Sequence, residues 1–149
     1  MADQYYEDIT VGEERSFGEY EVSEAEIIEF AEQYDPQPFH VDPEEAKKTL
    51  FGGLIASGWH TAAMTMNMLV ENYLNDSGAM GAAGIDGLRW KQPVRPGDTL
   101  TVETEVVGKE PWDGMAGVGV MESETTTRKQ NGTPVMTMTG LLLFPMRDP

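Results

Sequence analysis

Residues 59–74 carry apolar side chains around nearly every face of a helix, and this segment constrains the fold more than any other. One apolar row repeats at three- and four-residue spacing and contains Ala62, Ala63, Met66, Leu69, Val70 and Tyr73. Met64 and Met68 make the opposite face apolar as well. A helix that is hydrophobic all round is normally surrounded by protein. The pattern therefore predicts a buried central helix around which the other elements pack.

The C-terminal half of the chain reads as sheet. Strand-like segments cover residues 87–94, 99–109, 117–129 and 133–144. Between 99 and 109, apolar and polar residues alternate, as expected for a sheet with one solvated face. Asn131-Gly132 is a strong hairpin signal, and Pro96-Gly97-Asp98 supplies another turn. These segments predict a long antiparallel meander, preceded by a mobile, Gly- and Ala-rich connection over residues 76–87.

Two short helices are expected before the central one. A surface arm (1–15) and a short strand (17–22) lead to the first helix, where Ser23 and Glu26 form a capping box. Pro36 ends this helix, so its terminus falls on Asp35. Two prolines then predict a rigid, extended loop from Asp35 to His40.

The second short helix begins at Asp42, as the N-cap, and Pro43, as the first helical residue. It ends before Gly52-Gly53.

Length and composition limit the kinds of site. The 149 residues fit a single domain, 1–149, without cysteine. The absence of cysteine excludes disulfides, thiolate catalysis and Cys-ligated zinc. His40 and His60 are the only histidines, so we expect no metal site. No glycine run has the spacing of a nucleotide-binding loop, which leaves a redox cofactor without support.

The charge balance excludes other partners. The chain has 26 acidic and 10 basic residues, a net charge of -16, so nucleic acid and anionic membranes should be repelled. No apolar run is long enough to span a membrane, and the first ten residues lack the features of a signal peptide. We expect a halophilic, cytoplasmic protein, because concentrated salt screens self-repulsion.

Acid–base chemistry is indicated by Asp35 and His40. The two lie five residues apart on a segment that its prolines stiffen, between two well-capped helices. A carboxylate beside an imidazole can move a proton. The structural alternative is that Asp35 caps a turn and His40 packs against Phe39.

Gly58 stands where the central helix begins. Its N–H would be unpaired and reinforced by the helix dipole, which suits a developing oxyanion. The structural alternative is a turn glycine. Ser57 and His60 also suggest a serine hydrolase, but no G-x-S-x-G elbow is present, and a Ser-Gly before a helix is more typical of a cap.

The run DPQPFHVDP at residues 35–43, followed by FGGLIASG at 51–58, resembles the MaoC-like dehydratase and (R)-specific enoyl-CoA hydratase family. The segments YYEDITVGE (5–13) and SEAEIIEFA (23–31) are also similar, so the resemblance covers almost the whole chain. It implies an α+β hot-dog fold, an antiparallel sheet wrapped around a long central helix, and a homodimer or higher homo-oligomer.

The resemblance also implies a site. Asp35 and His40 would hold the catalytic water, and the Gly58 N–H would bind the thioester oxygen. We assign Ser57 and Trp59, which flank Gly58, to substrate binding as well. Two positions depart from the family pattern. Gln37 replaces a common asparagine, which we expect to affect only loop packing, and Met66 falls where a supporting serine is expected.

The expected function is reversible hydration of a trans-2-enoyl-CoA to the (R)-3-hydroxyacyl-CoA in fatty acid metabolism, without a metal or redox cofactor. A hot-dog thioesterase and a non-catalytic acyl-CoA-binding or scaffold subunit are the alternatives. The densest basic group, Arg89, Lys91 and Arg95, either meets the coenzyme A phosphates or is merely solvated.

Overall fold

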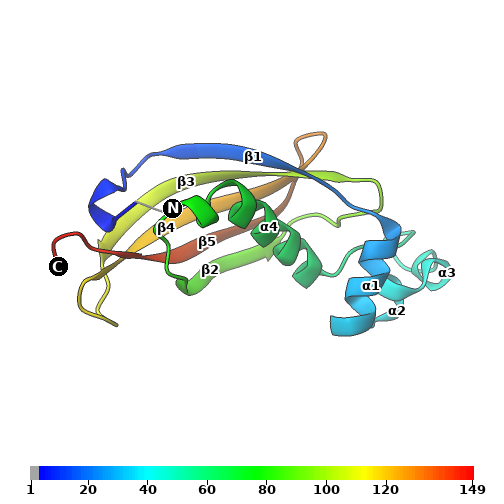
Figure 1. Cartoon of the computed structure of the whole chain (residues 1–149). Coiled ribbons are helices and arrows are strands. Elements are labelled where there is room, and N and C mark those ends of the chain that lie inside the picture. Colours follow the sequence, from blue (N-terminus) through cyan, green and yellow to red (C-terminus); the bar gives the residue numbers. More distant parts are fainter. Residues whose placement is uncertain (1–3) are drawn as a thin grey trace.

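A five-stranded antiparallel sheet curls around one long helix in the computed structural model, which describes residues 4–149 (Figure 1). The strands are β1 (Glu14–Glu21), β2 (Ala82–Trp90), β3 (Thr99–Pro111), β4 (Val118–Lys129) and β5 (Pro134–Pro145). Their order in the sheet is β1-β3-β4-β5-β2. The helix is α4 (Gly58–Asn72). The predicted α+β hot-dog fold is therefore confirmed.

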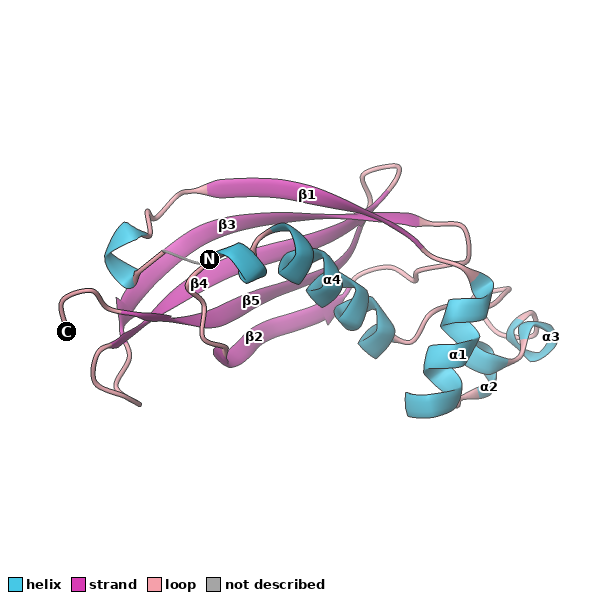
Figure 2. Ribbon diagram, in the orientation of Figure 1, coloured by secondary structure: helices cyan, strands magenta, loops and turns pink. Residues whose placement is uncertain are grey.

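The core lies between α4 and the sheet (Figure 2). Met64 and Met68 of α4 pack into one cluster with Leu100 and Val102 of β3. The alternation predicted for β3 is confirmed, because Leu100, Val102, Thr104 and Val106 are all buried. The same alternation continues in β4, where Met121, Ser123, Thr125 and Thr127 are buried.

The prediction that α4 is buried on every face is only partly right. The buried row consists of His60, Thr61, Met64, Thr65, Met68 and Leu69. Ala63 and Met66, from the other predicted row, are exposed. Thr65 fits into this buried row because its hydroxyl shares a hydrogen bond of 2.7 Å with the hydroxyl of Thr127 on β4. A polar pair satisfied in this way fits an apolar interior.

The prediction for β2 is wrong in both extent and position. The strand begins at Ala82, inside the stretch expected to be mobile, and pairs with β5 at the sheet edge. The sheet is therefore not a simple meander, because only β3, β4 and β5 follow one another in space. Gly84 and Gly87 obscure the strand pattern, and the pairing with β5 is long-range.

β1 also begins earlier than predicted, at Glu14. The preceding arm contains a 3-10 turn, η1 (Tyr6–Asp8), and Asp8 receives two hydrogen bonds from Arg147 at 2.8 and 3.1 Å. Residues 1–3 of the predicted arm lie outside the described part of the chain.

Three short helices gather beside the start of α4 (Figure 1). They are α1 (Glu24–Tyr34), α2 (Pro38–Val41) and α3 (Pro43–Ala46). Ser23 caps α1, as predicted, although the Glu26 side chain bonds to Tyr20 rather than completing the capping box. The extended loop predicted from Asp35 to His40 is shorter than expected, because Pro38 already occupies the first position of α2. A proline is tolerated there, since its missing N–H would have no partner.

Candidate active site

Asp35 and His40 meet at the end of α1. Asp35 is the C-cap of α1, and the single turn of α2 returns His40 towards it. Asp35 Oδ2 lies 3.4 Å from His40 Nε2. The two side chains are largely shielded, with exposed fractions of 18% and 6%. The structure thus brings together the two residues that the sequence singled out.

The ring of His40 is held in one tautomer. Its Nδ1 lies 2.7 Å from the carbonyl oxygen of Ile55. A carbonyl only accepts hydrogen bonds, so Nδ1 carries the hydrogen. In the neutral ring, Nε2 is then a bare acceptor that faces Asp35. The edge contact with Phe39, at a ring-centroid distance of 4.5 Å, further restricts the ring.

Two side chains hold the Asp35 carboxylate. Ser57 Oγ donates to Oδ2 at 2.6 Å, and Gln37 Nε2 donates to Oδ1 at 2.8 Å. The Ser57 hydrogen bond is the main cause that holds the pKa of Asp35 below its usual value, and the Gln37 bond and His40 act in the same direction against desolvation. The expectation that Gln37 affects only loop packing is therefore wrong.

Ser57 joins this carboxylate to α4. Its side chain is fully buried, and Oγ accepts a hydrogen bond from the Trp59 N–H at 3.3 Å, as an N-cap does. The cap predicted from Ser-Gly is confirmed. The same hydroxyl donates to Asp35, 22 residues earlier in the chain, so one side chain connects the end of α1 to the start of α4.

When Asp35 is ionised and the His40 ring carries a hydrogen only on Nδ1, the two side chains present acceptors to each other. Neither then donates to the other, so the pair suits a third group that donates to both. A water molecule has two hydrogens and forms such bonds at about 2.8 Å. The arrangement can therefore orient a water and remove its proton.

A cleft of about 270 Å³ opens beside His40. Gly58 lines it, and the Gly58 N–H has no hydrogen-bond partner within residues 4–149. The Ser57 carbonyl in the same peptide unit accepts from the N–H groups of His60 and Thr61, which polarises that unit. The other lining residues are Phe51, Ile55, Ala56, Thr61, Trp90, Lys91, Gln92, Pro93 and Val94.

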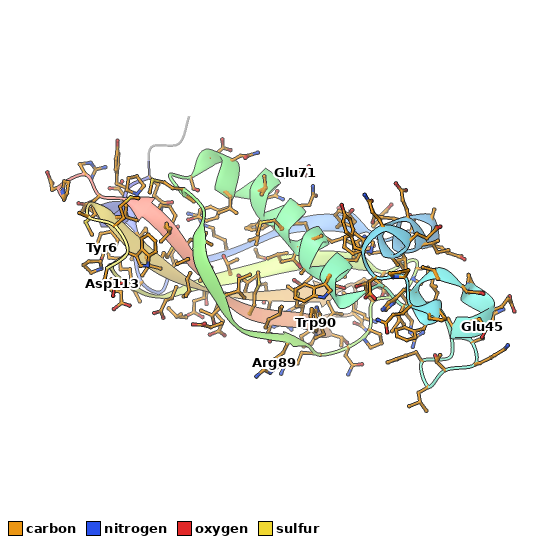
Figure 3. The ribbon with its side chains drawn as sticks, turned by 90° about the horizontal axis from the view of Figure 1, so that it is seen from below. Tyr6, Glu45, Glu71, Arg89, Trp90 and Asp113 are labelled. Carbon is orange, nitrogen blue, oxygen red and sulfur yellow. The ribbon has the colours of Figure 1, made fainter. Side chains whose placement is uncertain are left out.

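Trp90 is a site residue that the sequence did not reveal. A Cβ on Gly58 would lie 2.5 Å from the Trp90 ring, so this position accepts only glycine unless the ring moves. The indole N–H also donates to the Gly58 carbonyl at 2.9 Å. Figure 3 shows Trp90 at the end of β2 beside the first turn of α4. The contact joins residues 32 positions apart, so no local signal predicts it.

Trp59 does not line this cleft. Its side chain is 60% exposed and packs edge-on against Trp90 at 5.2 Å. The geometry of the cleft therefore gives no support to the assignment of Trp59 to substrate binding. Its backbone N–H instead donates a hydrogen bond to Ser57 Oγ.

The rejection of a serine hydrolase agrees with the structure, whereas the interpretation of Met66 changes. His60 Nε2 faces Glu26 at 3.4 Å and makes no hydrogen bond to Ser57 Oγ, so these residues do not form a hydrolase pair. Met66 lines a separate apolar cavity of about 320 Å³ near the other end of α4. It cannot be a position that supports Asp35. Ser57 makes that contact instead, and Thr61 is the α4 hydroxyl that lines the cleft.

The basic group lies around the cleft. Lys91 lines it, and Arg95 donates to the carbonyl of Phe51, another lining residue, at 2.7 Å. Arg89 is exposed and points away from the body of the protein (Figure 3). Within residues 4–149, none of the three takes part in an ion pair. The positive charges of Lys91 and Arg95 are thus available beside the cleft, whereas that of Arg89 is not.

Other classes of site receive no support from the described residues. In residues 4–149, no three His, Cys, Asp or Glu side chains gather so as to hold a metal ion. None of the helices in that range has the length and apolarity needed to cross a membrane.

Known proteins are similar to this chain in both sequence and fold. The family model of the MaoC like domain matches residues 8–129. The (R)-specific enoyl-CoA hydratase of Rhodospirillum rubrum is 34% identical over 108 residues, covering 72% of each chain. The uncharacterized protein YdeM of Bacillus subtilis is 30% identical over 124 residues, covering 83% of this chain and 88% of that one. The crystal structure of a MaoC-like dehydratase from Rhodospirillum rubrum has a TM-score of 0.87 and 40% identity, covering 97% and 99%.

Proposed function

Because this chain belongs to the MaoC-like domain family, we propose that it reversibly hydrates a trans-2-enoyl-CoA to the (R)-3-hydroxyacyl-CoA. The family is generally one of hydratases and dehydratases. The observation that carries the finer proposal is the pair of facing acceptors, Asp35 Oδ2 and His40 Nε2, 3.4 Å apart beside the cleft. Such a pair suits water as the nucleophile.

The proposed reaction uses three groups. The water oxygen bonds to Cβ of the enoyl group while its proton passes to the Asp35–His40 pair, which we treat as one coupled unit. The electron pair of the double bond forms a new bond between Cα and the carbonyl carbon, and the carbonyl π electrons move to the thioester oxygen, where the Gly58 N–H stabilises the enolate. The Asp35–His40 unit then returns a proton to Cα, and the carbonyl re-forms. Addition of water changes no net oxidation state, so the reaction requires no redox cofactor.

Coenzyme A is the proposed carrier. Lys91 lines the cleft, and Arg95 contacts Phe51, which also lines it. These two cations support the proposal, because they could meet the phosphates of a nucleotide carrier. The rest of the surface is strongly acidic, with a net charge of -16. Isolated cations on an acidic surface can bind a small anionic carrier, whereas the surrounding acidic surface repels a large acidic carrier protein.

In the same proposal the protein is a homodimer or larger homo-oligomer. The exposed large apolar side chains on α4 and β2 are Trp59, Met66, Ile85 and Trp90. β2 is an edge strand of the sheet. Apolar side chains beside an open strand edge suit a second copy of the chain. Sedimentation velocity tests this, and a single species of 16.5 kDa would contradict it.

The test of function is hydration of crotonyl-CoA by the purified protein, with the handedness of the product determined. We expect the (R) product from the wild type. Asp35→Asn and His40→Ala should each lower turnover by roughly 10²- to 10⁴-fold, the usual range for general acid–base groups. Both variants should remain folded by circular dichroism, because neither residue belongs to the hydrophobic cluster between α4 and the sheet.

Other outcomes separate the alternatives. Release of free thiol without hydration would indicate a thioesterase. Binding without turnover, repeated across several acyl lengths, would indicate a non-catalytic subunit. A crotonyl pantetheine thioester that lacks the nucleotide should show a raised KM, and an unchanged KM would contradict the role of the cations. Near-full activity in either variant would remove Asp35 and His40 from the site.

A further inference from the structure

A second polar cluster lies on the other side of the first turn of α4. Tyr20 of β1 donates its hydroxyl to Glu26 Oε2 at 2.6 Å, and Glu26 Oε1 lies 3.4 Å from His60 Nε2. The hydration mechanism uses none of these side chains. His60 is only 3% exposed, and its ring stacks on Phe30 at a centroid distance of 4.6 Å and an interplanar angle of 9°.

The cluster is held together by burial rather than by a full set of hydrogen bonds. Glu26 Oε1 and His60 Nδ1 have no hydrogen-bond partner within residues 4–149. Burial lowers the pKa of His60, which keeps its ring neutral, while the nearby Glu26 acts in the opposite direction. Burial and the bond to Glu26 raise the pKa of Tyr20 to about 12, so its hydroxyl remains a donor. Glu26 Oε1 is buried and faces His60 Nε2 at 3.4 Å, although the Glu26 side chain as a whole is 38% exposed.

His60 of α4 contacts Glu26 and Phe30 of α1. A cavity of about 290 Å³, open to solvent, lies between the two helices, lined by Tyr20, Glu26, Glu29, Phe30, Gln33, His60, Ala63 and Met64. The side chains of the two helices therefore do not pack continuously along this stretch. The contacts of His60 with Glu26 and Phe30 thus help to set the distance between the helices here.

That distance matters at the catalytic end of both helices. α1 ends at Asp35, and α4 begins after Ser57, whose hydroxyl donates to Asp35 at 2.6 Å. His60 lies two residues beyond Gly58, so it belongs to the same helical turn as the oxyanion donor. A shift of α1 against this turn lengthens the Ser57–Asp35 bond and moves the carboxylate relative to the Gly58 N–H.

We propose that His60, held by Glu26 and Phe30, is a positioning residue that sets α1 against α4 and thereby keeps the Asp35 carboxylate on Ser57. His60 touches neither the cleft nor the reacting atoms, so it acts through the helix contact. The consequence for turnover rests on the proposed hydratase function, whereas the consequence for the Asp35 carboxylate does not.

The first test does not depend on enzymatic activity. Carbon-13 NMR titration would follow the Asp35 carboxyl in the wild type and in His60→Leu, His60→Phe and Glu26→Gln. Because the Ser57 bond is the main cause of the lowered pKa of Asp35, the midpoint should rise towards 3.8 in these variants. Glu29→Gln is the matched control, since Glu29 lines the same cavity from the same helix without contacting His60 through a hydrogen bond or ion pair.

His60→Phe retains a ring that can stack on Phe30, and Glu26→Gln retains His60 itself, so at least one variant should fold if His60→Leu does not. An unchanged Asp35 midpoint in the folded variants would overturn the proposal. A rise in Glu29→Gln equal to that in Glu26→Gln would overturn it as well, because the effect would then belong to any loss of charge at the cavity.

The second test is kinetic. We expect kcat to fall about 10-fold or more in His60→Leu with little change in KM, because misplacement of a catalytic group slows the chemical step. His60→Gln, which keeps an N–H donor towards Glu26, should recover part of the loss. A fall that only follows the fraction of folded protein would indicate a structural role and contradict the proposal. A wild type without hydratase activity would contradict the proposed function and leave the NMR test to decide this inference.

Discussion

At the scale of single residues, Ser57 performs two tasks, and the loss of each can be measured separately. Ser57→Ala removes the N-cap of α4 and the hydrogen bond to Asp35. Loss of a serine cap costs about 1 kcal/mol of stability. Loss of the second bond raises the pKa of Asp35, so the acid limb of the kcat/KM profile should move to higher pH. Rate measurements across pH, together with thermal unfolding, test both effects.

Ser23→Ala is the matched control for this variant. Ser23 caps α1 by accepting from the Glu26 N–H at 3.1 Å, and it makes no contact with Asp35. Ser23→Ala should lose similar stability without a shift of the acid limb.

The pH dependence of stability gives a further test of Ser57→Ala. Because the pKa of Asp35 is lower in the folded state than its usual 3.8, the ionised carboxylate stabilises the fold above pH 3.8, and this stabilisation disappears as the pH falls through the folded-state pKa. The Ser57→Ala deficit should therefore be larger at neutral pH than in strong acid, and equal deficits would contradict it.

The site residues that could be predicted from sequence are those whose signals are local. Asp35 and His40 stand out through their spacing and the prolines between them, and Gly58 through its place at a helix start. Trp90 and the second bond of Ser57 could not be predicted, because both arise from contacts across more than 20 residues. Gln37 is an intermediate case. Its contact with Asp35 is local, but a side-chain amide in a loop carries no signal of its direction.

At the scale of elements, caps, turns and the antiparallel pairing of β3, β4 and β5 were predictable, whereas the long-range pairings of β1 and β2 were not. The N-caps at Ser23, Asp42 and Ser57 each depend on three or four consecutive residues, and the structure contains all of them. β2 depends instead on pairing with β5, about 55 residues later. Such a pairing overrides the weak strand propensity of a Gly-rich segment.

The two glycines of β2 should respond differently to alanine. Gly84 has no positive φ, and the nearest atom would lie 3.9 Å from an alanine Cβ, an ordinary contact distance, although the register with β5 also shifts between Ala82 and Gly84. Gly84→Ala should stabilise the protein by roughly 0.5 to 1 kcal/mol, since glycine weakens a strand interior. Gly87 has a φ of 62° and lies where the register with β5 shifts, so Gly87→Ala should destabilise the protein. Urea unfolding of both variants tests this, and effects of the same sign would contradict it.

At the scale of the whole molecule, part of the acidic charge forms a row of glutamates across the sheet. Glu14, Glu105 and Glu124 are direct cross-strand partners on β1, β3 and β4. All three are exposed and line a polar groove of about 550 Å³. Like charges directly opposite each other are destabilising. The neighbouring Glu103, by contrast, pairs with Arg128 at 3.0 Å. Part of the net charge of -16 therefore forms a row of mutually repelling carboxylates with no compensating cation within it.

This row gives the halophilic hypothesis a specific test. The melting temperature of the wild type should rise with molar KCl, because the screening length falls from about 10 Å at 0.1 M to about 3 Å at 1 M. Glu105→Gln removes the central charge of the row, so it should raise the melting temperature in low salt and reduce the gain from KCl. Glu103→Gln is the matched control on the same strand, and it should do neither, because it removes a paired charge. A wild type that gains nothing from KCl would contradict the hypothesis. Equal gains in the two variants would show that the repulsion is spread over the surface rather than concentrated between β1, β3 and β4.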